Sequence, residues 1–180
     1  FASSAGLFLF GRSVDVDSYD RPVLLSAPLA PNGVGPFVLA SSADLHDFSS
    51  VGTALTESHA FLFGGYSTSA TGASVEIDSV LALPADLAAG TLGTSNAISP
   101  LSAPRRYIST LVHGGYVYAV GGYSSSTPRP ALDVGKIESG GAITWAAPVD
   151  MPGEVSGTYG VHSAAVCAEG QRMYVVGGTF

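Results

Sequence analysis

The sequence has little charge and almost no lysine, and these shortages exclude two classes of partner. Only 12% of its 180 residues are charged, Lys136 is the sole lysine, and the formal net charge is -7. Nucleic-acid binding requires a basic surface that offsets phosphate charge, and anionic membranes attract similar basic clusters. We therefore expect neither nucleic acid nor a membrane surface as a partner.

Cysteine and long apolar runs are equally scarce. Cys167 is the single cysteine, so the chain cannot form an internal disulfide. Its neighbours Val166 and Ala168 predict a small buried core residue rather than a reactive thiol. No apolar run approaches the roughly 20 residues of a membrane-spanning helix, so we expect no membrane insertion. Abundant glycine, serine and alanine with scarce lysine favour an extracellular or cell-surface location.

The chain contains instead a recurring apolar segment that ends in glycine. Copies occur at residues 7–12, 60–65, 116–122 and 173–178, the first of them degraded because arginine replaces its second glycine. They lie 53, 57 and 56 residues apart when they are aligned on Gly11, Gly64, Gly121 and Gly177. A period near 50 residues is typical of a repeat architecture, in particular of a β-propeller.

Each copy predicts the same small unit of β-structure. Four or five apolar residues that stop at glycine predict a strand buried on both faces, since a half-solvated strand would alternate with polar residues. The double glycine predicts unusual backbone angles and close approach by a neighbouring backbone. Preceding strands and glycine turns at 111–115 and 165–171 predict hairpins, and weaker strands are expected around 75–83 and 132–138. The pattern gives about four short strands per repeat.

The segment from Val75 to Phe180 resembles kelch repeats of the bacterial and extracellular type. The resemblance is carried, in the family's order, by the double-glycine strands, Leu92-Gly93, Trp145 and the prolines near Pro104 and Pro152. It implies an all-β, kelch-like β-propeller segment of about three four-stranded blades, in which Trp145 belongs to the core. The copies would span roughly residues 1–53, 54–110 and 111–180.

The first copy also resembles the FG-GAP repeat of integrin-type propellers, which often bind calcium. Phe10-Gly11 is followed by an acidic loop in which Asp15, Asp17 and Asp20 are the calcium candidates. The loop lacks the glycine that a tight calcium loop needs, and the later copies lack these aspartates. Both resemblances imply a propeller, so the expected fold is the same for either.

Three repeats cannot complete a ring, because closed propellers contain about four to eight blades. The chain begins and stops at the same phase of the repeat without an initiator methionine. This favours a piece of a longer polypeptide over a partial propeller that another chain completes. In both cases an open blade edge would expose strand hydrogen-bonding groups and apolar surface. Further blades or self-association are therefore expected.

Four residues are candidates for a binding site. Arg105 and Arg106 follow the proline segment of the second copy, where the kelch resemblance implies an arginine at the mouth of the central channel. Such a pair could hold a carboxylate or sulfate, or it could tie neighbouring blades together. The equivalent places are assigned to Phe48 and to residues 157–158, so a ring of arginines is not expected. Tyr66 and Tyr123 each follow a double glycine and could stack on a sugar, anchor a protein or wedge adjacent blades.

No catalytic or metal-binding constellation is evident. The histidines have no fixed partner, no cysteine cluster occurs, and no serine lies in a nucleophile motif. Kelch-type propellers include copper radical oxidases and sialic-acid mutarotases, but neither residue set is found here. We therefore expect no cofactor and a non-catalytic binding or scaffolding module that contacts protein, or glycan, through its blade loops. The alternatives are a structural subunit that packs edge to edge into a fibre or shell, and a fragment of an enzyme whose active site lies in missing blades.

Overall fold

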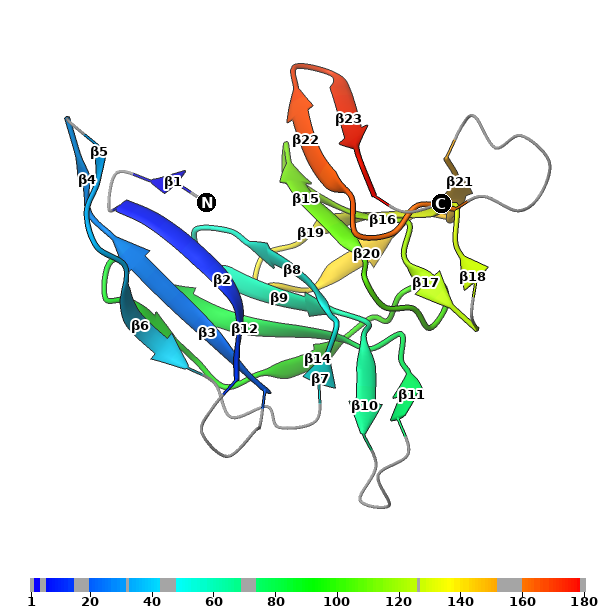
Figure 1. The fold of residues 1–180 in the computed structure, drawn as a ribbon, viewed down its shortest axis with the longest axis horizontal. Helices are drawn as coiled ribbons and strands as arrows, with labels where there is room; N and C mark the ends of the chain where they lie inside the picture. Colours follow the sequence, from blue (N-terminus) through cyan, green and yellow to red (C-terminus); the bar gives the residue numbers. More distant parts are fainter. Residues whose placement is uncertain are drawn as a thin grey trace.

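The protein is all-β. The computed structural model describes residues 2–3, 6–14, 20–31, 33–42, 48–68, 74–125, 127–151 and 160–178. These residues form strands and turns without a helix, and the strands are grouped in several antiparallel sheets that do not close on themselves (Figure 1). This arrangement is an incomplete β-propeller-like segment, as the repeats predict.

Two sheets, which we call blades 2 and 3, have the strand order expected for one repeat. Blade 2 consists of β8 (Gly52–Leu55), β9 (His59–Phe63), β12 (Val80–Asp86), β13 (Thr91–Leu92) and β14 (Asn96–Ile98). Blade 3 consists of β15 (Ser109–His113), β16 (Tyr116–Val120), β19 (Ala131–Ile137), β20 (Ile143–Trp145) and β21 (Val149–Asp150). In each blade the fourth position is shared by two short strands that pair with different parts of β12 or β19.

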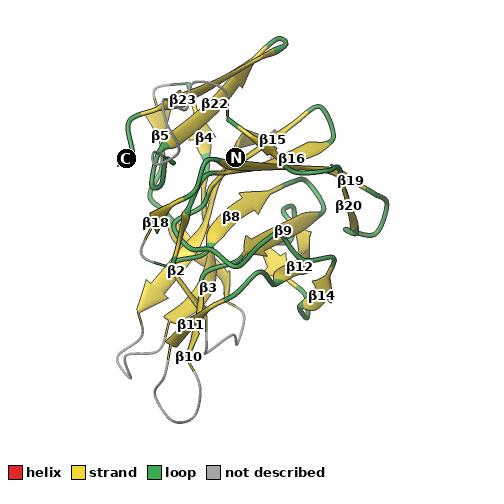
Figure 2. Ribbon diagram, turned by 90° about the vertical axis from the view of Figure 1, so that its right-hand side faces the viewer, coloured by secondary structure: helices red, strands yellow, loops and turns green. Residues whose placement is uncertain are grey.

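The two ends of the chain form less complete units. Blade 1 consists of β1 (Ala2–Ser3), β2 (Gly6–Val14), β3 (Asp20–Ala27) and β6 (Val38–Ser42), and a small hairpin, β4 (Leu29–Ala30) with β5 (Gly33–Val34), precedes β6. The C-terminal hairpin consists of β22 (Ala165–Glu169) and β23 (Arg172–Val176). It projects from the rest of the protein in both views (Figures 1 and 2).

Short strands outside the blades follow the double glycines. One small sheet joins β7 (Phe48–Ser49), β10 (Tyr66–Thr68) and β11 (Ser74–Glu76), and a hairpin joins β17 (Tyr123–Ser124) to β18 (Thr127–Pro128). The single strand expected around 75–83 is thus divided into β11 and β12. Ile77 causes the break, because its carbonyl accepts a hydrogen bond from the Arg105 backbone and its own amide donates to Gly65.

Strand β9 of blade 2 is buried on both faces, as its sequence predicts. Ala60 and Leu62 lie in a core cluster with Phe8 of blade 1. The alternate residues, Phe61 and Phe63, lie in a second cluster with residues of blade 3. The first strands of successive units, β8, β15 and β22, also lie next to one another. The core is therefore a series of junctions between sheets. The repeat boundaries expected at 53/54 and 110/111 fall inside the strands β8 and β15.

The double glycines are required by close packing between repeats. Gly64 and Gly121, which begin two of the pairs, have φ of +57° and +60°, a conformation that other residues rarely adopt. A Cβ at Gly64 would collide with the carbonyl of Arg105, and one at Gly121 would collide with the carbonyl of Val161. Both expected roles, unusual angles and close backbone approach, are confirmed.

Cys167 does not belong to the core, so that expectation is wrong. Its side chain is exposed, whereas its neighbours Val166 and Ala168 are half-buried. Side chains alternate between the two faces of a strand, so Cys167 lies on the face of β22 opposite to these neighbours. No sheet covers that face among the residues the structure describes, which explains why a core-type sequence is left exposed.

Trp145 lies at the edge of the core between blades 2 and 3. It is half-buried, packs against the cluster that contains Phe63, and meets that ring edge-on at 6.3 Å between centroids. Its indole N–H donates a 2.9 Å hydrogen bond to the Ser99 carbonyl of blade 2's last segment. The tryptophan thus joins two blades.

Candidate functional site: a tyrosine–arginine cluster at the blade loops

The structure gives the two adjacent arginines different roles. Arg105 is only 1% exposed, and its Nη2 forms an ion pair with Asp133 and a 3.3 Å hydrogen bond to the Ala119 carbonyl, both in blade 3. Its backbone bonds to Ile77 and Gly65 of blade 2. Burial lowers the pKa of Arg105, against the opposing effect of the Asp133 carboxylate. Arg105 therefore ties two blades together and does not reach the surface.

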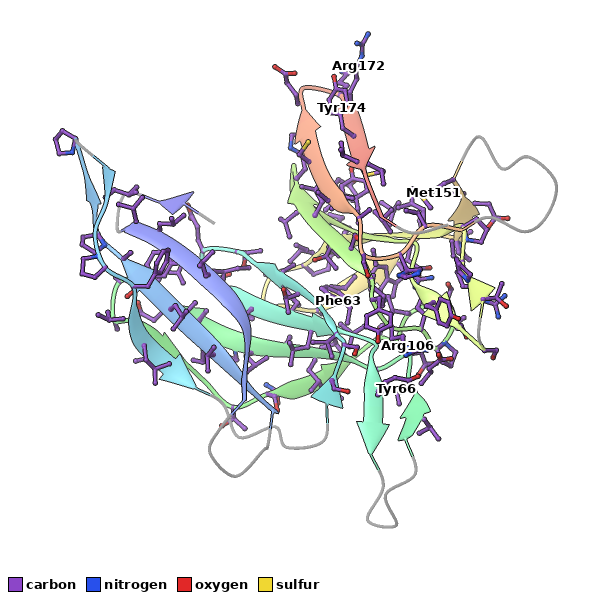
Figure 3. All side chains as sticks on the ribbon, viewed as in Figure 1. Phe63, Tyr66, Arg106, Met151, Arg172 and Tyr174 are labelled. Carbon is purple, nitrogen blue, oxygen red and sulfur yellow. The ribbon has the colours of Figure 1, made fainter. Side chains whose placement is uncertain are left out.

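Arg106 lies among three tyrosines. Its guanidinium carbon is 4.5 Å from the centre of the Tyr66 ring, 4.8 Å from that of Tyr107 and 4.7 Å from that of Tyr123. Tyr66 begins β10, where Figure 3 shows it beside Arg106, and Tyr123 begins β17, the corresponding strand of the next repeat. At these distances a cation is attracted to each ring face. The sequence candidates Tyr66, Arg106 and Tyr123 are thus brought together.

A carboxylate completes the cluster from a neighbouring strand. Arg106 Nε donates to Glu76 Oε1 at 3.2 Å, and Nη1 donates to the Tyr107 hydroxyl at 3.3 Å. The other oxygen of Glu76 accepts the Ser125 backbone N–H at 2.9 Å. Both carboxylate oxygens are engaged, so Glu76 holds β11 and the turn after β17 against Arg106 and neutralises its charge.

His162 adds an imidazole ring to the cluster from the loop that leads to β22. Its centroid lies 5.8 Å from that of Tyr107 and 5.2 Å from that of Tyr123, the second pair in an edge-on arrangement. We define the tyrosine–arginine cluster as Tyr66, Glu76, Arg106, Tyr107, Tyr123 and His162. The short strands β10, β11 and β17, the segment before β15 and the loop before β22 therefore contribute to one site.

The backbone of the cluster contains a repeated left-handed residue. Ser50, Tyr107 and Ser163 have φ of 56°, 55° and 56°, and each precedes the first strand of its unit by two residues. The Tyr107 amide donates to the Ser50 carbonyl at 2.9 Å, and the Ser163 amide donates to the Tyr107 carbonyl at 3.1 Å. These bonds link equivalent positions of consecutive units. The conformation is thus a feature of the repeat, and Tyr107 adopts it although a bulky residue with φ > 0 is rare.

Sequence analysis missed three members of the cluster. His162 lies 56 residues after Arg106, the same step as the repeat, so correct alignment would have found it. The structure corrects the assignment of residues 157–158 as the arginine equivalent: the carbonyls of Arg105 and Val161 play the same part, each accepting a hydrogen bond from the second glycine of a pair. Tyr107 directly follows the two arginines, but no sequence signal distinguished it, and none pointed to Glu76.

The acidic loop that contains the calcium candidates lies largely outside the described residues. Asp15 and Asp17 lie outside the described residues, and Asp20 is described only by its backbone at the start of β3. Within the described ranges, no group of three or more His, Cys, Asp or Glu side chains could hold a metal ion. The same part of the chain contains no helix of the length and hydrophobicity needed to cross a bilayer.

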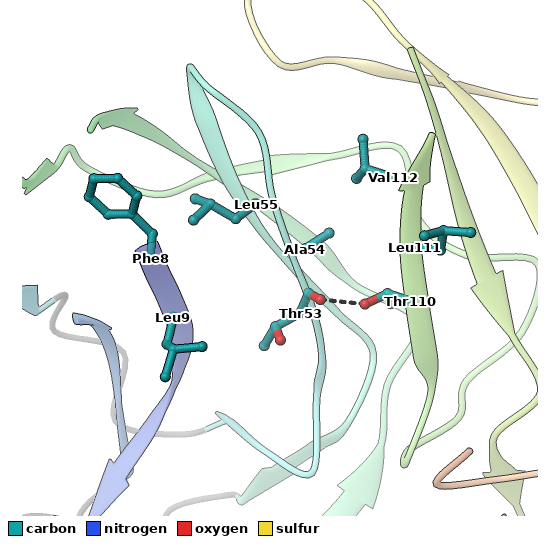
Figure 4. A pocket seen from close by; sticks show the side chains of 8 residues that line it. All are labelled: Phe8, Leu9, Thr53, Ala54, Leu55, Thr110, Leu111 and Val112. Atoms are coloured by element: carbon teal, nitrogen blue, oxygen red, sulfur yellow. Dashed lines mark hydrogen bonds between the residues drawn. The ribbon is translucent and has the colours of Figure 1, made fainter. Parts of the chain in front are cut away.

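A hollow lies between blade 1 and the first strands of blades 2 and 3. The hollow has a volume of about 360 Å³ and is lined by Phe8 and Leu9, residues 53–55 and residues 110–112 (Figure 4). The Thr110 hydroxyl donates to the carbonyl of Thr53 across it. Its lining contains no charged or titratable side chain, so it offers less chemistry than the tyrosine–arginine cluster.

Comparisons with known proteins identify the fold alone. No protein-family model matches this chain, and no curated protein sequence matches it. Among solved structures, that of YjhT superposes with a TM-score of 0.61 at 12% sequence identity. The match covers 94% of this chain and 56% of YjhT, so the chain spans little more than half of that structure.

Proposed function

We propose that this chain is a kelch-like, non-catalytic binding module of an extracellular or surface assembly, and that the tyrosine–arginine cluster is the centre of its contact with a protein partner. The observation that carries this proposal is the position of Arg106 against three tyrosine rings, one of which, Tyr107, is 39% exposed. Tyrosine and arginine are enriched among the residues that dominate binding energy at protein interfaces.

The cluster is prepared for binding without rearrangement. Glu76 and the three rings fix the plane of the Arg106 guanidinium, so little side-chain freedom is lost when a partner docks. Within the described residues, Nη2 of Arg106 makes no hydrogen bond and can donate to an acceptor on the partner. The exposed part of the Tyr107 ring offers apolar surface beside that donor.

The same geometry does not favour Glu76 as a catalytic acid or base. A general acid or base needs a titratable group within reach of a bound substrate. Both oxygens of Glu76 are already engaged by Arg106 and by the backbone of Ser125. Glu76 is therefore held as a structural partner of Arg106 and is not free to act as a general acid or base.

Replacement of Tyr107 by serine tests the proposal with the least damage to the fold. Serine occupies the equivalent left-handed positions 50 and 163, so Tyr107→Ser keeps a residue that the backbone accepts. Proteins captured from the extracellular fraction of the source would be compared for the wild type, for Tyr107→Ser and for the control Tyr116→Ser. Tyr116 is 41% exposed on β16, outside the cluster.

We expect Tyr107→Ser to lose a captured protein that wild type and the control retain, with a dissociation constant raised by about 30-fold, the effect of a 2 kcal/mol hot spot. Circular dichroism would verify that all three proteins are folded. Equal capture by the three proteins would refute the site. Binding to a glycan array that depends on Tyr107, without any captured protein, would replace the protein partner by a carbohydrate.

A further inference from the structure

The tyrosine–arginine cluster offers more hydrogen-bond donors than acceptors. An arginine side chain carries five N–H donors, and within the described residues Arg106 directs one toward Glu76 and one toward the Tyr107 hydroxyl. That hydroxyl accepts the bond, so its own hydrogen remains a donor. Each oxygen of Glu76 already accepts a hydrogen bond, one from Arg106 and one from the Ser125 backbone. The cluster therefore suits a ligand that brings acceptors and few donors.

The balance of charge favours an uncharged acceptor over a carboxylate. Glu76 offsets the charge of Arg106, since its Oε1 lies 3.2 Å from Nε. The chain as a whole has a net charge of -7, so its field repels an acidic ligand. Main-chain carbonyl groups are uncharged acceptors, and a peptide segment presents one at every residue.

The tyrosine rings lie close enough together for one short extended segment to contact them. The ring centres of Tyr66 and Tyr123 are 4.5 and 4.7 Å from the same guanidinium carbon. Their separation therefore does not exceed one turn of a polyproline II helix, which advances about 9 Å in three residues. Tyr107 is 39% exposed, and the other two tyrosines are half-buried, so all three retain surface for a ligand.

We propose that the partner contacts the tyrosine–arginine cluster through a proline-rich segment in the polyproline II conformation. Proline has a carbonyl but no backbone N–H, so it matches a site that is rich in donors. Carbonyls of the segment accept hydrogen bonds from Arg106 Nη2 and from the Tyr107 hydroxyl, while its proline rings pack on the tyrosines. The segment is already ordered before it binds, so little freedom is lost. This inference rests on the proposed function, because it names the chemistry of the ligand at the same site.

Selection from a display library of random short peptides tests the proposal on the purified chain. We expect the wild type to enrich peptides with two prolines three residues apart and few acidic residues. The dissociation constant of a synthetic copy should rise about 30-fold with Tyr107→Ser, which removes the ring, and about 5-fold with Tyr107→Phe, which removes only the hydroxyl donor. The control Tyr116→Ser, at an exposed tyrosine of β16 outside the cluster, should leave it unchanged.

Two further measurements examine the chemistry of the selected peptide. Replacement of both prolines by alanine should weaken binding by at least about 10-fold, because the ring contacts and the pre-formed conformation are lost. An increase in ionic strength from about 0.1 to 1 M shortens the Debye length from about 10 to 3 Å and should change the dissociation constant by less than about twofold. A carboxylate bound to Arg106 would instead lose affinity with salt, and that result would overturn the proposal.

The remaining outcomes distinguish a failure of this inference from a failure of the proposed function. Peptides that depend on Tyr107 but carry aspartate or glutamate in place of proline, or that tolerate the alanine replacements, would overturn the proline-rich segment and leave the cluster as the binding site. So would the absence of any Tyr107-dependent peptide when Tyr107→Ser still loses a captured protein. If neither peptides nor captured proteins depend on Tyr107, the site itself is refuted, and the inference with it.

Discussion

Arg105 and Arg106 are neighbours in the chain but lie in two different regions of the molecule. Arg105 is enclosed between blades 2 and 3, where Asp133 balances its charge. Arg106 is at the loop end of the same blades, where its side chain is 18% exposed and is held mainly by aromatic faces. A buried charge depends strongly on its partner, whereas a partly exposed one keeps some contact with water. The comparison separates residues that hold the blades from residues that are available for binding.

The largest effect on stability is expected at the buried ion pair of Arg105 and Asp133. Asp133→Asn removes the charge that balances Arg105 while it keeps the shape of the side chain. An uncompensated buried charge should lower the free energy of unfolding by about 3–5 kcal/mol. Urea unfolding followed by tryptophan fluorescence measures the change, because Trp145 packs on the same core.

The double variant Arg105→Met with Asp133→Leu provides the control for the buried pair. Apolar residues of similar volume often replace a buried ion pair without loss of stability. The Arg105 Nε and Nη1 atoms have no hydrogen-bond partner in the described part of the structure, and their removal relieves that cost as well. The double variant should therefore be within about 1 kcal/mol of wild type, or more stable. A double variant as unstable as Asp133→Asn would contradict this account of the pair.

A smaller effect on stability is expected at Arg106, whose side chain is partly exposed. Arg106→Gln removes the interactions with three tyrosine rings and the ion pair with Glu76. Each partly exposed cation–π contact contributes about 0.5–1 kcal/mol, so the loss of three contacts and of the largely buried ion pair should lower the free energy of unfolding by about 2–3 kcal/mol. The same urea titration measures it, and Arg106→Lys, which keeps the charge without the planar group, should recover only a small part. A loss of stability as large as that of Asp133→Asn would show that Arg106, like Arg105, mainly holds the blades together.

The strands and the roles of the double glycines could be predicted from the sequence, because local pattern determines both. The run that ends at Gly121 forms β16, and the double glycines meet neighbouring carbonyls as expected. The different roles of Arg105 and Arg106 could not be predicted, because they depend on a contact with Asp133, 28 residues away, and on the bridge between Arg106 and Tyr123. Cys167 was misassigned for a related reason: a periodic apolar strand indicates that a face can be covered, not that a neighbouring sheet is present.

The smallest effect on stability is expected at Tyr107, where the contribution of the backbone conformation can be measured separately from that of the ring to binding. Tyr107→Ser keeps a non-glycine residue at φ 55°, whereas Tyr107→Gly removes the steric cost of that conformation. The Tyr107→Gly variant should therefore have a free energy of unfolding about 0.5–1 kcal/mol higher than that of the Tyr107→Ser variant. The reason is that the left-handed region costs residues other than glycine roughly 1 kcal/mol or more. Ser50→Gly, at the equivalent position with φ 56°, should show the same gain, and the same unfolding titration compares all three. Both changes at Tyr107 should lose the partner equally, because both remove the ring. If glycine retained binding that serine lost, backbone conformation rather than the tyrosine ring would determine recognition.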